Sequence, residues 1–220
     1  MSLRRVFSSS VGTKILIGAT GLLLFVYLLV HLVGNLMVFA GQETFNHYAH
    51  TLISNPLVVP AEIGLALIFL LHIAKAVMMW TKNRAARPVA YEEKAWAGYK
   101  SRKSVGSTTM IWTGLATLVF VVIHLAHIKY GVWYQIGDPP VRDLYRTEVE
   151  VFSSPIWVAV YVAAMLLIGF HLRHGISSAF QSLGVSHPVY TKRIVMAGTI
   201  LAVLIAGGFA IIPIWVYLTR

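Results

Sequence analysis

Residues 11–40 read VGTKILIGATGLLLFVYLLVHLVGNLMVFA, a long apolar run with one lysine, Lys14, and no carboxylate. An α-helix rises about 1.5 Å per residue, so roughly twenty such residues cross a hydrocarbon layer of about 30 Å. The run therefore predicts a transmembrane helix. His31 lies well inside it, where an ionisable side chain is costly, and this makes it a candidate for a functional site.

Four more apolar runs follow in the rest of the chain. They cover residues 57–80, 108–128, 155–180 and 194–218. The chain is 57% hydrophobic and 12% charged, and its mean hydropathy is +0.72, which is typical of membrane proteins. The runs lack the alternation of barrel strands, and in lipid each backbone amide must be bonded within its own segment. The predicted fold is all-α: one integral membrane domain, residues 1–220, formed by a bundle of five transmembrane helices.

The basic residues predict the orientation of this bundle. Lys and Arg are concentrated in cytoplasmic loops of membrane proteins. Twelve lie on one expected side, namely Arg4, Arg5, Lys14, Lys82, Arg84, Arg87, Lys94, Lys100, Arg102, Lys103, Lys192 and Arg193, and four on the other, namely Lys129, Arg142, Arg146 and Arg220. We therefore expect a cytoplasmic N-terminus, in a tail that is retained, and a C-terminus outside. The net charge of +10 then serves topology and contact with anionic lipid, and no nucleic acid partner is expected.

Four of the nine histidines lie deep inside separate runs. Counting about 1.5 Å per residue, His31 and His124 lie roughly 28 Å and 24 Å from the cytoplasmic side, so they share an outer level. His72 and His174 lie roughly 21 Å and 28 Å from the outer side, so they share an inner level. Two histidines at each level are what bis-imidazole ligation of two stacked b-type haems requires.

Two neighbouring histidines leave the choice of ligands open. His127 follows His124 by three residues, and His171 precedes His174 by three, so the members of each pair share a helix face. Depth favours His124, because His127 approaches the outer interface near Lys129. The heights of His171 and His174 differ by only about 4.5 Å, and depth does not separate them.

Other residue types narrow the chemistry. Haem propionates favour cationic or hydroxyl partners, and five such residues are expected at the inner ends of the helices: Lys75, Arg173, Ser177, Thr108 and Thr109. The chain has no cysteine, which excludes covalent haem attachment and a thiolate-bound iron–sulfur cluster. Glycine-rich nucleotide loops and hydrolase-type arrangements are also missing. We therefore expect electron relay between another protein and a lipid-soluble carrier.

Six motifs, in their order and spacing, resemble the diheme cytochrome b subunit of succinate:quinone oxidoreductases, the single-chain, five-helix type that anchors succinate dehydrogenase or fumarate reductase. They are LLVHLVGN (28–35), FNHYAH (45–50), FLLHIAK (69–75), SRKSVGSTTMIWTG (101–114), VIHLAHI (122–128) and FHLRHGISSAFQSLG (170–184). The resemblance covers essentially the full length and implies a multi-pass protein of the bacterial cytoplasmic membrane.

The resemblance also implies which residues ligate the two b haems. In that family the ligands come from the first four helices in the same order, which implies His31, His72, His124 and His174 as axial ligands of haem iron. The HG pair at 174–175 implies His174 rather than His171. The haem on His72 and His174 would be proximal to the soluble subunits, and the haem on His31 and His124 distal to them.

The resemblance implies partners and a substrate as well. The partners would be a flavoprotein subunit and an iron–sulfur subunit, with residues 82–103 as part of the docking surface. Quinone would react near the outer haem, where the polar candidates are Glu43, Asn46, His47, His50 and Glu62. Some fumarate-reducing relatives carry a glutamate two residues before the fourth-helix ligand, and Leu172 at that place favours succinate oxidation by menaquinone.

We thus expect the membrane-anchor subunit of a succinate dehydrogenase, which passes electrons through two b haems to menaquinone and carries no succinate chemistry itself. The heterotrimer as a whole could also form a dimer. One alternative is the cytochrome b anchor of a hydrogenase or a formate dehydrogenase. Another is a cofactor-free, proton-coupled carrier that uses the histidines as relays, or histidines that only bond helices together.

Overall fold

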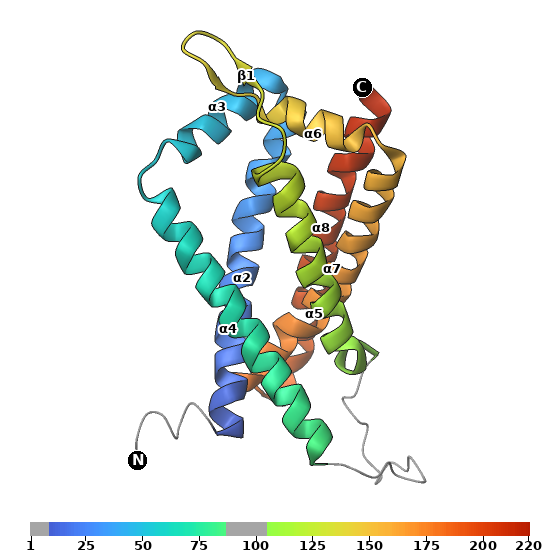
Figure 1. Cartoon of the computed structure of the whole chain (residues 1–220). Helices are drawn as coiled ribbons and strands as arrows, with labels where there is room; N and C mark the ends of the chain where they lie inside the picture. The colour runs from blue at the N-terminus through green and yellow to red at the C-terminus, as the bar shows by residue number, and fades with distance from the viewer. Residues whose placement is uncertain (1–8, 87–104) are drawn as a thin grey trace.

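Five long helices make up the body of the structure, a computed structural model that describes residues 9–86 and 105–220 (Figure 1). They are α2 (Ser10–Asn35), α4 (Val58–Ala85), α5 (Val105–His124), α7 (Pro155–Ser182) and α8 (Pro188–Thr219). A 3-10 turn, η1 (Leu36–Ala40), continues α2, and a π-helical turn, η2 (Leu125–Lys129), continues α5. Each of the five is long and apolar enough to span a membrane, so the all-α, five-helix membrane fold is confirmed.

Local sequence explains where these helices begin. The Ser9 side chain caps α2 by accepting a hydrogen bond from the Gly12 amide at 3.0 Å. Both α7 and α8 have proline in their first turn, where the missing N–H would have no intrahelical partner. Helix α4 continues to Ala85, beyond the apolar run that ends at Trp80, because Lys82 and Arg84 in its last turn suit the negative end of the helix dipole.

Shorter elements close one end of the bundle. They are α3 (Gln42–Ile53), the strands β1 (Gln135–Ile136) and β2 (Val141–Arg142), and α6 (Leu144–Phe152). The two strands pair antiparallel, with Gln135 opposite Arg142 and Ile136 opposite Val141. The C-terminus lies at this end, and α2 begins at the other (Figure 1). We call these ends the hairpin end and the N-terminal end.

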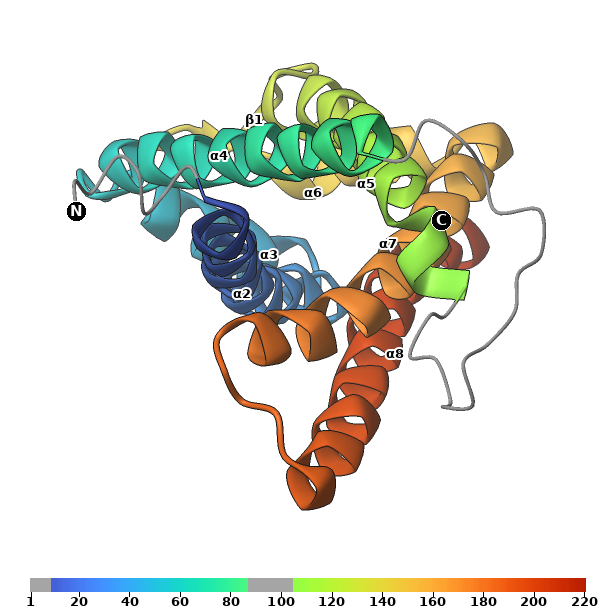
Figure 2. The same cartoon turned by 90° about the horizontal axis from the view of Figure 1, so that it is seen from below.

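The helices do not pack equally tightly. Helices α7 and α8 lie against each other along much of their length, α2 packs against both α4 and α7, and α5 packs against α7. In contrast, α4 runs along one edge of the bundle, beside α2 (Figure 2). It touches α5 only slightly and contributes no buried residue. At the α2–α7 crossing a Cβ on Gly18 would lie 3.2 Å from the Ala179 carbonyl oxygen, so this position requires glycine for close approach.

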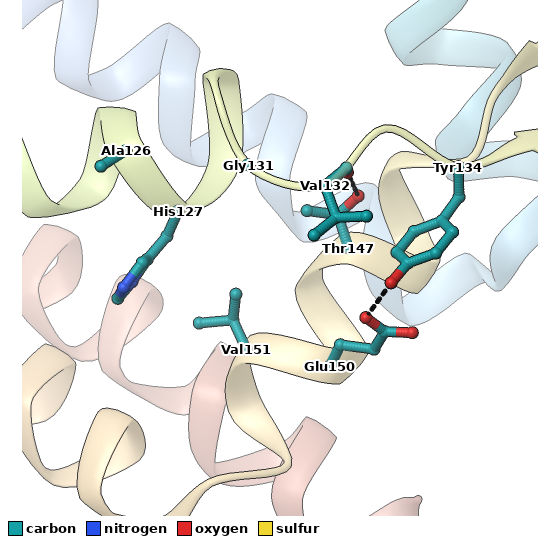
Figure 3. A pocket seen from close by; sticks show the side chains of 8 residues that line it. All are labelled: Ala126, His127, Gly131, Val132, Tyr134, Thr147, Glu150 and Val151. Atoms are coloured by element: carbon teal, nitrogen blue, oxygen red, sulfur yellow. Dashed lines mark hydrogen bonds between the residues drawn. The ribbon is translucent and has the colours of Figure 1, made fainter.

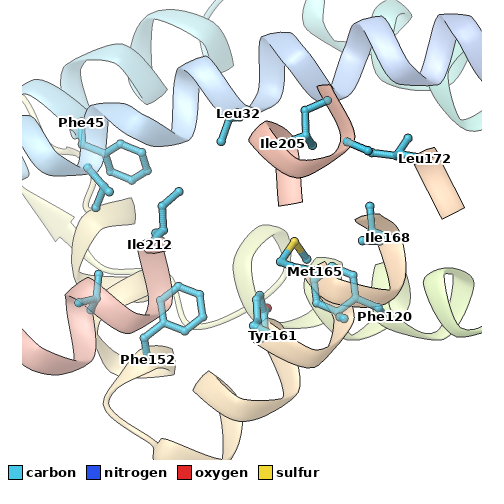
Figure 4. Close-up of a cluster of buried hydrophobic side chains, with 14 of the residues drawn as sticks. Leu32, Phe45, Phe120, Phe152, Tyr161, Met165, Ile168, Leu172, Ile205 and Ile212 are labelled. Atoms are coloured by element: carbon cyan, nitrogen blue, oxygen red, sulfur yellow. The ribbon is translucent and has the colours of Figure 1, made fainter. Parts of the chain in front are cut away.

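The hydrophobic core lies between α2, α5, α7, α8 and the cap of short helices. Labelled members include Leu32, Phe120, Phe152, Tyr161, Met165, Ile205 and Ile212 (Figure 4). The core therefore sits on the α7–α8 side of the bundle. Helix α8 contains no ionisable residue between Val195 and Tyr217, and it packs mainly on α7.

Candidate functional site

The structure brings His31 and His124 together near the hairpin end. His31 belongs to α2, and His124 is the last residue of α5. Their ring centres lie 5.9 Å apart and their planes are nearly perpendicular, at 86°. Two imidazoles that bind one metal ion from opposite sides have ring centres roughly 6 Å apart, because each metal–nitrogen bond is about 2 Å long. This pair therefore has the spacing that axial ligation of one iron needs.

Aromatic side chains surround the His31–His124 pair. Tyr27 stacks on His31 at 5.3 Å, and Phe120 stacks on His124 at 5.8 Å. Tyr161 of α7 faces His124 with ring centres 6.1 Å apart. His124 Nδ1 is buried and has no hydrogen-bond partner among the residues that the structure describes. An unpaired buried imidazole nitrogen beside a second imidazole is unusual in a core, and it fits a site that a ligand completes.

His127, the neighbour that left the choice open, has other contacts. It lies in the π-helical turn η2, where its Nδ1 is 3.3 Å from the Tyr161 hydroxyl. Its ring packs edge-on against Trp157 at 4.3 Å. His127 therefore contacts side chains of α7, and His124 rather than His127 lies against His31.

His72 of α4 lies against α2. Its Nδ1 is 3.1 Å from the Thr20 hydroxyl oxygen. The next residue, Gly21, makes this approach feasible, since a Cβ there would lie 3.2 Å from His72 Cε1. The ring is thus held by a Thr-Gly step on the neighbouring helix.

His171 of α7 has the same surroundings on α5. Its Nδ1 is 3.1 Å from the Thr113 hydroxyl oxygen, and a Cβ on Gly114 would lie 3.3 Å from its Cε1. It also interacts electrostatically with His72 and with His174. His174 lies one turn further along α7 and is partly buried, and its carbonyl accepts a hydrogen bond from Ser177. His171 is therefore the α7 histidine whose environment matches that of His72.

Both histidine pairs have a donor set suited to haem. Imidazoles from facing helices are the usual ligands of b-type haem iron. Helix α2 packs on α4, and α5 packs on α7, whereas α4 and α5 are only in loose contact. His31 and His72 therefore lie on the α2–α4 side, and His124 and His171 on the α5–α7 side. Among the described residues no group of three or more His, Cys, Asp or Glu could hold a bare metal ion. Two imidazoles from separate helices are the donors that a bis-imidazole haem uses.

A polar clasp joins α3 to α6 at the hairpin end, and sequence reasoning missed it. Asp143 is 4% exposed, and it accepts hydrogen bonds from Asn46 at 2.8 Å, from Gln42 at 2.8 Å and from the Arg146 amide that it caps at 3.1 Å. The Asn46 side-chain oxygen in turn accepts from the Tyr145 amide at 2.9 Å. Asn46, a quinone candidate from the sequence, is thus fully engaged in this clasp.

The remaining quinone candidates occupy different positions. Glu43, His47 and His50 are exposed on α3. Glu62, near the start of α4, forms an ion pair with Lys129 and interacts electrostatically with Tyr27, which stacks on His31. Of the two candidate carboxylates, Glu62 is therefore the one that is linked to the His31–His124 pair through a shared neighbour, Tyr27.

The propionate candidates lie on α4, α5 and α7. Lys75 is one turn beyond His72 and partly buried, and Arg173 is exposed. Ser177 donates its hydroxyl hydrogen to the His174 carbonyl at 3.1 Å, and Thr108 and Thr109 have interactions of their own. Of the basic segment 82–103, residues 87–103 lie outside the described residues.

A pocket opens beside His127 at the hairpin end (Figure 3). Its lining residues come from η2, the following loop and α6: Ala126, His127, Gly131, Val132, Tyr134, Thr147, Glu150 and Val151. On its far side the Tyr134 hydroxyl donates to Glu150 at 2.5 Å, and this bond lowers the pKa of the Glu150 carboxyl. The pocket has one titratable ring from a helix end and one ionised carboxylate from α6.

Buried Glu148 and Arg142 were also missed from sequence. Glu148 is 3% exposed, and its Oε2 has no partner within residues 9–86 and 105–220. Burial raises the pKa of Glu148 to about 8. Arg142 donates to the Ile128 carbonyl at 2.5 Å and lies over the Trp133 ring at 4.4 Å, so it caps the end of η2. The only sequence signal for these residues was the charge of a short loop, which does not indicate burial.

Comparison with known proteins supports the same interpretation. The chain is 28% identical over 170 residues to the succinate dehydrogenase cytochrome b558 subunit of Bacillus subtilis (strain 168), and the match covers 77% of each protein. No protein-family model and no solved structure matches the chain. The match confirms the resemblance to the cytochrome b subunits of succinate:quinone oxidoreductases and, with the five apolar helices, a multi-pass protein of the bacterial inner membrane.

Proposed function

We propose that this chain is the membrane-anchor cytochrome b subunit of a succinate dehydrogenase and that it passes electrons through two b haems to menaquinone. The observation that carries the proposal is the close approach of His31 and His124, which come from separate helices. His72 and His171, also from separate helices, interact electrostatically and would form the second pair. The similarity to a succinate dehydrogenase cytochrome b558 subunit supports the same assignment. Haem, when bound, supplies one-electron transfer.

For the second haem we propose His72 and His171 as axial ligands, in place of the His174 that the resemblance implied. His171 shares with His72 the 3.1 Å contact to a threonine and the adjacent glycine. From the first residues of α4 and α7, His72 and His171 lie about 21 Å and 24 Å along their helices, whereas His174 lies about 28 Å along. Contact and height therefore both favour His171.

We propose that the N-terminal end faces the cytoplasm and receives electrons from an iron–sulfur subunit, which is joined to a flavoprotein that oxidises succinate. The bias of Lys and Arg toward this end supports the orientation, and cationic side chains there would attract an acidic partner surface. The chain's own task at this end is to hold the partner close to the His72–His171 pair, so that electrons enter there and leave at the His31–His124 pair.

We propose that the quinone is reduced at the hairpin end, beside the His31–His124 pair. Reduction of a quinone takes up two protons with two electrons, so a group that exchanges protons is needed within reach. Glu62 is the candidate, because it interacts electrostatically with Tyr27, and Tyr27 stacks directly on His31. The pocket beside His127 is a second place at the hairpin end where polar side chains could contact a quinone.

The direction of electron flow follows from a missing carboxylate. The transmembrane glutamate of some fumarate-reducing relatives lies two residues before the fourth-helix ligand. Here that place is Gly169 if His171 ligates and Leu172 if His174 does, so neither assignment provides a carboxylate. We therefore propose succinate oxidation by menaquinone, rather than fumarate reduction, as the physiological direction.

The haem ligands can be tested by single substitutions in the full chain, purified with its partner subunits. We expect His31→Ala and His124→Ala to remove one haem and His72→Ala and His171→Ala the other, because a bis-imidazole site with one ligand loses most of its affinity. His174→Ala and the exposed His187→Ala serve as matched controls that keep both haems. Haem per chain from the pyridine haemochrome assay, with reduced-minus-oxidised spectra, is the measurement.

Each outcome of this test is informative. Loss of one haem in His174→Ala together with two haems in His171→Ala would restore the assignment implied by the resemblance. A wild-type protein that contains no haem, even after hemin is supplied during expression, would refute the proposed function and favour a cofactor-free carrier. A haem protein that copurifies with a hydrogenase or a formate dehydrogenase would favour the other oxidoreductase.

The role of Glu62 needs a separate test. We expect Glu62→Gln to lower quinone reduction by roughly 10²–10⁴-fold, the usual range for loss of a general acid–base group, while both haems are still reduced by succinate. The control is Glu43→Gln, which removes an exposed carboxylate from α3. Equal rates in the two variants would exclude Glu62 as the proton-exchanging group.

A further inference from the structure

We propose that Thr20 and Thr113 are positioning residues that hold His72 and His171 with the proton on Nδ1 and so leave Nε2 of each ring to bind iron. The inference rests on the proposed function, since it concerns the haem that this pair would hold. It adds to that function a specific device: a threonine hydroxyl on a neighbouring helix that selects the tautomer of each ligand.

The direction of the hydrogen bonds follows from the single hydrogen of a hydroxyl group. Thr20 Oγ1 is 2.6 Å from the Leu16 carbonyl oxygen and 3.2 Å from that of Ile17. Carbonyls only accept, so the hydroxyl hydrogen is used within α2. At the 3.1 Å contact the Thr20 oxygen must then accept, and His72 Nδ1 must be the donor.

The same accounting holds on the other side of the bundle. Thr113 Oγ1 is 3.2 Å from the carbonyl oxygens of both Thr109 and Met110, so its hydrogen is used within α5. His171 Nδ1 must therefore donate to Thr113 at 3.1 Å. Thr113 is only 8% exposed and Thr20 only 5%, so water does not compete for these bonds.

The two arrangements match residue by residue. In each, a Thr-Gly step of one helix meets a histidine of the next, and the carbonyl three residues before the threonine, of Ile17 or Met110, also interacts with the ring. Each glycine lies close to the Cε1 atom of the ring. A Cβ would lie 3.2 Å from His72 Cε1 if Gly21 had one, and 3.3 Å from His171 Cε1 if Gly114 had one. An accidental contact would not recur in this detail on a second pair of helices.

This geometry has a chemical consequence for a bound haem. A hydrogen bond from the far nitrogen of a metal-ligating imidazole fixes the ring orientation and makes the ligating nitrogen more basic. A more basic ligand stabilises ferric over ferrous iron. Thr20 and Thr113 should therefore both tighten the haem on His72 and His171 and keep its reduction potential low.

The test replaces the hydroxyl by a methyl group of equal size. We expect Thr20→Val and Thr113→Val each to weaken binding of this haem by roughly 10–100-fold, the usual effect of losing such a partner, and to move its midpoint potential to a more positive value. The shift should be accompanied by a changed low-spin ferric signal in electron paramagnetic resonance. Haem affinity is measured by transfer to excess apomyoglobin, and the potential by redox titration of the purified complex.

Two sets of variants control this experiment. Thr199→Val makes the same change in α8, where the hydroxyl donates only to its own helix, at Val195, and it should leave both haems unchanged. Thr20→Ser and Thr113→Ser keep the hydroxyl and should restore affinity, potential and signal. If a valine variant does not accumulate, alanine, which favours helix more than valine does, carries the same expectation.

The outcomes separate this inference from the proposed function. Wild-type protein without haem refutes both. Two haems in the wild type, with the same affinity and potential in the valine variants as in Thr199→Val, refute only the positioning role. Failure of serine to restore the wild-type values would also refute it, because then side-chain shape rather than the hydroxyl would matter.

Discussion

At the scale of single residues, Glu148 is a buried carboxyl outside the membrane spans. It lies in a short helix, its Oε2 has no partner in the part of the chain that the structure describes, and burial raises its pKa to about 8. A carboxyl with a raised pKa is held in its neutral form at neutral pH. Its stability contribution is therefore complete below the pKa of the unfolded chain, near 4.5, and is lost as pH rises through about 8.

We expect Glu148→Gln to remove this pH dependence. The amide is close in size and carries no charge, so the variant should be more stable than the wild type above about pH 8 and similar to it near pH 5. Thermal unfolding of the detergent-solubilised protein at several pH values is the measurement. Glu150→Gln, an exposed change on the same helix, is the control. Parallel curves for wild type and Glu148→Gln would contradict the expectation.

Single residues also mark where sequence reasoning reached its limit. His31, His72 and His124 could be named as candidate ligands because each lies alone, or in the better position, within an apolar run. His171 and His174 share a helix face, and only the contact with Thr113, which depends on how α5 and α7 pack, distinguishes them. Burial of Glu148 could not be foreseen either, because a short polar segment gives no sign of which face is covered.

At the scale of elements, close packing of α2 on α7 depends on Gly18. We expect Gly18→Ala to be less stable than Gly64→Ala by about 1–3 kcal/mol, the usual cost of overpacking, because the new methyl group meets the Ala179 backbone. Gly64 lies on α4 with nothing within 4 Å of a Cβ, so alanine there should be neutral or stabilising. Thermal unfolding of both variants is the measurement, and equal stabilities would contradict it.

The long helices were predictable and the short ones were not. An apolar run that is long enough to span a membrane has one plausible structure, which is why all five spans are confirmed. Helices α3 and α6 depend instead on the clasp between Asp143 and Asn46, which are 97 positions apart in the chain. No local pattern contains that pairing, so the cap of the bundle had no signal in the sequence.

At the scale of the whole molecule, α4 is the least firmly held span. It packs on α2, touches α5 slightly and has no buried residue, whereas α7 and α8 share the core. On the proposed assignment a haem between His72 and His171 supplies the missing contacts. We expect removal of haem to increase amide hydrogen exchange in α4 far more than in α8. Exchange measured by mass spectrometry in haem-loaded and haem-depleted protein tests this, and a uniform change along the chain would contradict it.

The order of the helices along the chain sets the order in which the protein can mature. In the proposed pairs, His31 needs α5 and His72 needs α7, so each partner is synthesised well after the residue it joins. The haem near the hairpin end can be captured once the third span has left the ribosome, but the other must wait for the fourth. A biosynthetic intermediate that is stalled between these two points would therefore already bind one of the two proposed haems and absorb visible light.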